Sequence, residues 1–103
     1  MQVPMINAII SSLKLKIAHS PLEDGEKTRI CALVDEIPHK VLQELYDSAS
    51  VKMSASTMMY ICCFVAGLGA ESVAAIFGIE TSSVYRTKYR IRKMFPNNKI
   101  LPF

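Results

Sequence analysis

The sequence predicts an all-α protein of about six helices, and three observations support this fold class. Apolar residues recur at intervals of three and four positions in several segments, which is the spacing of one helix face. No segment has the apolar–polar alternation of a half-buried strand, and glycine and proline mostly stand between the periodic segments. Half of the 103 residues are hydrophobic, so a core can form without disulfides or metal.

The first half of the chain is expected to form three helices. The first spans about residues 4–18. The second is expected to begin in a capping box made by Ser20 and Glu23, and to end before Pro38, because proline disfavours helical geometry in the residue before it. Pro38 then opens a third helix that ends near residues 47–50. The apolar residues assigned to these helices are Ile6, Ile9, Ile10, Leu13, Ile17, Ile30, Leu33, Val34, Ile37, Val41, Leu42 and Leu45.

Three more helices are expected in the second half. Ser54 is a natural cap for a helix that ends at Gly67, and the next helix runs from about residue 70 to a turn at Gly78. The last helix runs from about 81 to 95, and the tail of residues 99–103 is expected to dock back on the core. Candidate caps for the last helix are Thr81, Ser82 and Ser83.

Charge is distributed unevenly along the chain. Residues 1–80 hold six Lys or Arg and nine Asp or Glu, for a net charge of −3. Residues 81–103 hold six Lys or Arg and no acid, for a net charge of +6. A basic end on an acidic body indicates a polyanionic partner, although a basic helix can also be simply a solvated surface.

Several functional classes are disfavoured by the composition. Cys31, Cys62 and Cys63 lie in apolar surroundings, form no CxxC pair and are remote from the two histidines, so neither a disulfide framework nor a metal site is expected. The longest apolar run has about 13 residues, which is too short to span a membrane, and no signal peptide is recognisable. We expect a cytoplasmic protein with no cofactor. No nucleophile–base pair, carboxylate dyad or phosphate-binding glycine loop indicates an enzyme.

The last helix is expected to have two distinct faces. Val84, Ile91 and Phe95 fall on one side, flanked by Thr87, and are assigned to the core. Lys88 lies near this side and is expected to extend its ammonium outward. The opposite side centres on Ser82, Arg86, Tyr89 and Lys93, and is flanked by Tyr85, Arg90 and Arg92.

Residues 53–95 resemble the DNA-binding domain of LuxR-type transcription regulators, in a register that holds without a gap. The family pattern places Leu-Thr, Gly, Ile-Ala, Leu-x-Ile, Thr-Val and Ile at fixed positions. The corresponding residues here are Met53-Ser54, Gly67, Val73-Ala74, Phe77-Gly78-Ile79, Ser83-Val84 and Ile91. The layout is also similar to the DNA-binding region of sigma factors. The resemblance implies N-terminal helices followed by a C-terminal tetrahelical helix-turn-helix.

The function that the resemblance and the charge imply is that of a DNA-binding transcriptional regulator. Residues 51–103 would form the helix-turn-helix domain, and residues 1–50 a helical segment for dimerisation or regulation. A homodimer would bind double-stranded DNA, and RNA polymerase or a regulatory protein would be further partners. The residues expected to contact base edges are Ser82, Tyr85, Arg86 and Tyr89, and those expected to contact phosphates are Arg90, Arg92 and Lys93.

The alternative is a helical protein–protein interaction module built on the same scaffold. The apolar positions follow the family pattern more closely than the polar positions do. Four of the polar positions that differ are Ser72, Glu80, Tyr85 and Thr87. The apolar stripes of the N-terminal helices also suit a protein partner. Salt dependence separates the two hypotheses, because phosphate binding weakens steeply with salt and apolar association does not.

Overall fold

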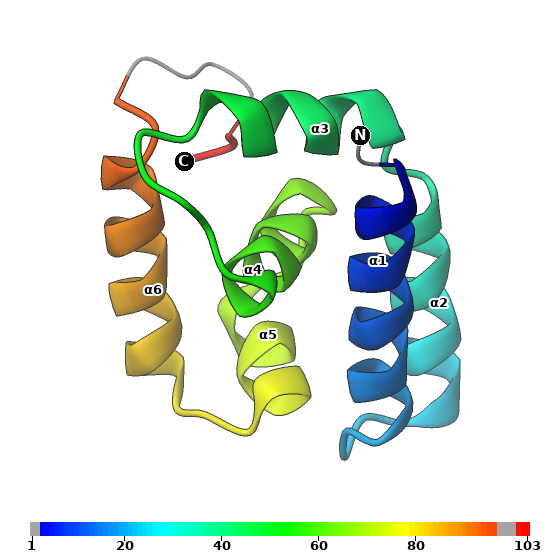
Figure 1. Cartoon of the computed structure of the whole chain (residues 1–103). Helices are drawn as coiled ribbons and strands as arrows, with labels where there is room; N and C mark the ends of the chain where they lie inside the picture. The colour runs from blue at the N-terminus through cyan, green and yellow to red at the C-terminus, as the bar shows by residue number, and fades with distance from the viewer. Residues whose placement is uncertain (1–2, 97–100) are drawn as a thin grey trace.

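The computed structural model describes residues 3–96 and 101–103, and within these ranges it contains six α-helices and no strand (Figure 1). The prediction of an all-α fold is therefore confirmed. The helices are α1 (Val3–Ala18), α2 (Asp24–Asp35), α3 (His39–Ser48), α4 (Ala55–Val65), α5 (Ala70–Phe77) and α6 (Thr81–Lys93).

Helix α1 is the packing centre of the molecule, since it contacts α2, α3, α4 and α5. Helix α6 packs mainly against α5, and Figure 1 shows α6 on one side of α4 and α1 on the other. The buried residues of both halves form one continuous core, with Leu13 and Ile17 of α1 and Ile61 of α4 fully inaccessible to solvent. The division of the chain into residues 1–50 and 51–103 stays a prediction.

The two ends of α4 are formed as the sequence predicts. The Ser54 hydroxyl accepts a hydrogen bond of 3.2 Å from the backbone N–H of Thr57, which satisfies one of the unpaired donors of the first turn. At the other end, Gly67 has a φ of 86°, and the N–H of Leu68 donates to the carbonyl of Cys63 over 3.1 Å. This left-handed glycine closes the helix at no steric cost.

The predicted capping box at Ser20 and Glu23 is wrong. Helix α2 begins at Asp24, and its N-cap Glu23 makes no side-chain capping bond. The hydroxyl of Ser20 is buried and donates instead to the carbonyl of Ile17 over 2.7 Å. Ser20 therefore satisfies the end of α1 rather than the start of α2, because a serine can bond to backbone groups on either side.

The C-terminal tail docks on the core, as expected, in the part that the structure describes. Leu101 is buried, and the ring of Phe103 meets the ring of Phe64 edge-on at a centroid distance of 5.3 Å. Residues 99 and 100, which belong to the same prediction, lie outside the described ranges. In the described part of the chain, no helix has both the length and the apolar character required to cross a bilayer.

Candidate nucleic-acid interface

A tight turn positions α6 after α5. Gly78 adopts a left-handed conformation with φ 67° and ψ 38°, and the N–H of Ile79 donates to the carbonyl of Ala74 over 3.0 Å. The chain then returns to extended geometry at Glu80, which is the N-cap of α6. The prediction that Thr81, Ser82 or Ser83 caps this helix is wrong, because all three lie inside it and Glu80 provides no side-chain bond.

One side of α6 fixes the helix to the body of the protein. Val84 and Ile91 are fully buried, and Thr87 exposes 6% of its surface. Phe95, just beyond the helix, is 1% exposed and continues the same side. The predicted packing side is thus confirmed. Burial of several apolar side chains along one side fixes the rotation of α6 about its own axis. This rotation determines which residues of α6 face solvent.

The opposite side of α6 is polar, basic and aromatic. Tyr85 and Tyr89 are 60% and 66% exposed, an unusual state for large rings. We call the six exposed residues on this side the basic face; they are Ser82, Tyr85, Arg86, Tyr89, Arg90 and Lys93. Six of the seven residues predicted to contact DNA therefore share one exposed surface.

Two contacts order the side chains of the basic face. The Nη2 atom of Arg86 donates to the hydroxyl of Ser83 over 2.9 Å, one turn earlier in the helix. The ammonium of Lys93 lies 4.5 Å from the centroid of the Tyr89 ring, within the range of a cation–π interaction. These local contacts leave the cationic groups at the surface while limiting their rotamers.

Arg92 differs from the other predicted contact residues. Its side chain is half-buried, and its Nη1 atom donates to the carbonyl of Phe95 over 2.7 Å. At about 100° per residue, Arg92 lies roughly 80° from Val84 on the helix and so at the margin of the packing side. Its guanidinium satisfies a carbonyl just beyond the end of α6, where a positive charge also stabilises the helix dipole.

Lys88 lies near the packing side of α6, as predicted, and its ammonium is close to three aromatic rings. Lys88 is half-buried, and its ammonium lies 5.2 Å from the ring centroid of Phe64 and 5.6 Å from that of Phe103. The ring of Tyr85 is 5.9 Å away. The aromatic faces attract this cation and keep it beside the docked tail.

The cations of α6 have no carboxylate partner among the described residues. The ion pairs found there join Lys14 to Asp35 and Arg29 to Glu26, all in α1 and α2. The bond from Arg29 lowers the pKa of Glu26. Two cations of the N-terminal helices are therefore paired with a carboxylate, whereas no cation of α6 is paired in this way within the described ranges, so a positive potential is expected over the basic face.

Tyr60 of α4 is close enough to Arg90 for its pKa to respond to the charge of that residue, and the sequence pattern does not predict this. Its ring stacks on that of Phe77 with centroids 4.0 Å apart. Burial raises the pKa of Tyr60, while the positive charge of Arg90 opposes the rise, which indicates that the guanidinium is near the phenol. No sequence spacing links residues 60 and 90, so only the packing of α4 against the C-terminal helices reveals this proximity.

Metal and thiol chemistry find no support in the described residues. No group of three or more His, Cys, Asp or Glu is placed to hold a metal ion there. Cys62 and Cys63 are fully buried, and burial raises the pKa of Cys62 to about 12. A thiol in this state is almost never ionised near neutral pH, which agrees with the predicted core role.

Comparisons of the chain with known protein families, with curated proteins and with solved structures found no match. The basic face of α6 is therefore the feature from which a function is inferred.

Proposed function

We propose that this protein binds double-stranded DNA by inserting the basic face of α6 in the major groove, and that it acts as a transcriptional regulator. The proposal rests on an exposed basic and aromatic surface on a helix whose opposite side is buried, and on the lack of a carboxylate partner for its cations within the described part of the chain. The major groove of B-DNA admits one α-helix, and phosphates attract uncompensated Arg and Lys side chains. Helix α5, the turn at Gly78 and α6 would together form the helix-turn-helix.

The residues of the basic face would divide between two tasks. Ser82, Tyr85, Arg86 and Tyr89 would meet base edges, because they lie on the exposed side and closer to the start of α6 than Arg90 and Lys93 do. Arg90 and Lys93 would meet phosphates and so position the helix without reading sequence. Arg92 uses one of its five N–H donors on Phe95, and others remain for a phosphate at the margin of the groove.

A LuxR-type arrangement and a homodimer belong to the same proposal. Two copies related by a twofold axis would present two α6 helices to half-sites about 34–36 Å apart, or a multiple of that distance. The N-terminal helices would supply the contact between copies or with RNA polymerase or a regulatory protein.

A second candidate is a protein-interaction module, which the exposed rings of Tyr85 and Tyr89 favour. They are one helical turn apart and both exposed, and aromatic side chains are enriched at the centre of protein interfaces. A partner bound by these rings would be insensitive to salt, whereas DNA would dissociate as salt rises.

The proposal is tested by fluorescence anisotropy with a pool of mixed-sequence labelled duplexes at low salt. The protein is expected to bind the pool, and Arg86→Ala with Lys93→Ala is expected to weaken binding at least about tenfold. The matched control is Lys27→Ala with Lys40→Ala, which removes the same charge from α2 and α3 and is expected to change affinity by less than about twofold. Absence of binding, or equal losses in both double variants, would refute the proposal.

A further inference from the structure

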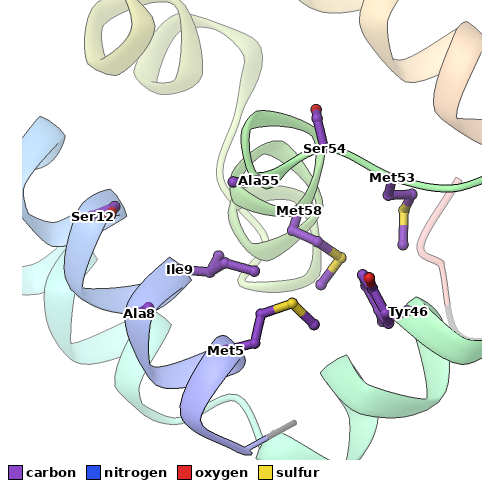
Figure 2. Close-up of a pocket in the computed structure, with 9 residues that line it drawn as sticks. All are labelled: Met5, Ala8, Ile9, Ser12, Tyr46, Met53, Ser54, Ala55 and Met58. Carbon is purple, nitrogen blue, oxygen red and sulfur yellow. The ribbon is translucent and has the colours of Figure 1, made fainter. Parts of the chain in front are cut away.

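A pocket opens between α1, α3 and the start of α4, on residues that the proposed DNA interface does not use. Figure 2 shows it lined by Met5 and Ile9 of α1, by Tyr46 of α3, and by Met53 and Met58 at the start of the second half of the chain. Three of the nine described residues that line it are methionines, and the whole chain contains only six.

The size of the pocket limits what it can hold. Its volume is about 200 Å³. An apolar cavity of about 150 Å³ accommodates a benzene molecule, whereas sites for drug-sized ligands begin at about 300 Å³. The pocket therefore has room for one six-membered ring with a small substituent, and not for a fused polycyclic compound or a long acyl chain.

The chemistry of the walls favours an aromatic and uncharged occupant. None of the described residues that line the pocket is charged, so an ionic ligand would lose its hydration without gaining a counter-charge. Methionine sulfur makes favourable contacts with aromatic rings, and its unbranched side chain adapts to the shape of a guest. Met5, Met53 and Met58 reach the pocket from separate backbone segments (Figure 2). Met5 is half-buried whereas Met53 and Met58 are buried, so Met5 is the most accessible of the three to a guest.

Of the described residues that line the pocket, three carry a hydroxyl, namely Ser12, Tyr46 and Ser54, and the phenol of Tyr46 is the one assigned here to orient such a ring. Figure 2 shows the oxygen of Tyr46 on the side of Met53 and Met58. The hydroxyl of Ser54, also at the pocket, already accepts the capping bond from Thr57. We propose that the pocket binds a small neutral molecule with one aromatic ring and one hydrogen-bonding substituent, of which phenol is the simplest representative. Tyr46 donates to or accepts from that substituent, and the methionines enclose the ring.

The test uses the methionine methyl groups as local probes, and it does not depend on DNA binding. The protein is labelled with ¹³C at the methionine methyls and titrated with phenol. The methyl signals of Met5, Met53 and Met58 are expected to shift along saturable curves, with a dissociation constant on the order of 1 mM or lower. Met94, which does not line the pocket, serves as the internal control. No saturable shift at the three pocket methyls, or equal shifts at Met94, would overturn the proposal.

Paired variants locate the site. Ala8 lies on the exposed rim, so Ala8→Leu is expected to fill the pocket without disturbing the core and to weaken phenol binding at least about tenfold. Asn7→Leu adds a similar side chain at the neighbouring exposed position, outside the pocket, and is expected to leave binding unchanged. Unaltered binding to the Ala8 variant would show that phenol sits elsewhere, and thermal unfolding of both variants verifies that they are folded.

Two further probes test the ligand class. Cyclohexanol has the size and hydroxyl of phenol but no aromatic ring, and loss of the sulfur–ring contacts is expected to weaken binding about tenfold. Benzoate keeps the ring but is charged, and no saturable binding is expected. Cyclohexanol or benzoate binding as tightly as phenol would overturn the assignment of a neutral aromatic ligand.

Discussion

The salt dependence of DNA binding gives a quantitative prediction from the cations of α6. Arg90, Arg92 and Lys93, the three cations assigned to phosphates, have no carboxylate partner among the described residues. Each cation that replaces a counterion on B-DNA contributes about −0.9 to the slope of log K against log salt, so these three contribute about −2.7 per protein chain. Raising salt from about 50 to about 200 mM should then weaken binding about 40-fold.

The double variant Arg90→Ala with Lys93→Ala leaves one of these cations. Its slope should fall to about −0.9, and the same change in salt should weaken binding only about 3.5-fold. The assay is anisotropy of one labelled duplex at a series of salt concentrations, with the Lys27→Ala and Lys40→Ala control in parallel. A slope near zero for the unaltered protein, or the same slope in the unaltered protein and the double variant, would refute the assignment of these side chains to phosphate binding.

Three further predictions concern the stability of the fold. Ile91 is fully buried, so Ile91→Ala should lower the free energy of unfolding by about 2–5 kcal/mol in urea denaturation. Gly78→Ala should lower the free energy of unfolding by about 1–2 kcal/mol, because φ is 67° at that position. Gly25→Ala should raise the free energy of unfolding by about 0.5 kcal/mol, because Gly25 lies inside α2 and no atom is within 4 Å of the added Cβ. Thermal unfolding of the two variants distinguishes these opposite signs. Burial raises the pKa of Cys62 to about 12 from an ordinary value of 9.0, and it also raises the pKa of Cys63. Above pH 9, the unfolded chain therefore releases thiol protons that the native state retains. Stability should therefore fall as pH rises, by about 1.4 kcal/mol per thiol at pH 10, and the drop should diminish when both cysteines are replaced by alanine.

Much of the fold could be predicted because its helices follow local rules. The isoleucine and leucine spacing of residues 6–17 predicts the buried side of α1, and all the residues that it marks are buried. Ser54 and Gly67 bound α4 as expected, because each acts on backbone groups within a few residues. The basic face was predicted for the same reason, since the position of Val84 and Ile91 in the core determines which side of α6 is exposed.

The remaining features depend on contacts between distant residues. The hydroxyl of Ser20 can bond either to the end of α1 or to the start of α2, and in the structure it donates to the carbonyl of Ile17. Lys88 is held at the rings of Phe64 and Phe103, which come from α4 and the tail. The methionine-lined pocket is formed only when α1, α3 and α4 meet, and no periodicity within one helix contains that information.

The most direct test of the central claim is a map of DNA contacts on the protein. Amide chemical shifts of ¹⁵N-labelled protein would be followed during titration with a duplex that it binds. The predicted result is a cluster of perturbed residues on the basic face of α6, centred on Arg86 and Tyr89, with α2 and α3 unaffected. Perturbations that cluster on α1, α2 or α3 and leave α6 unchanged would contradict the claim that α6 is the DNA-binding helix.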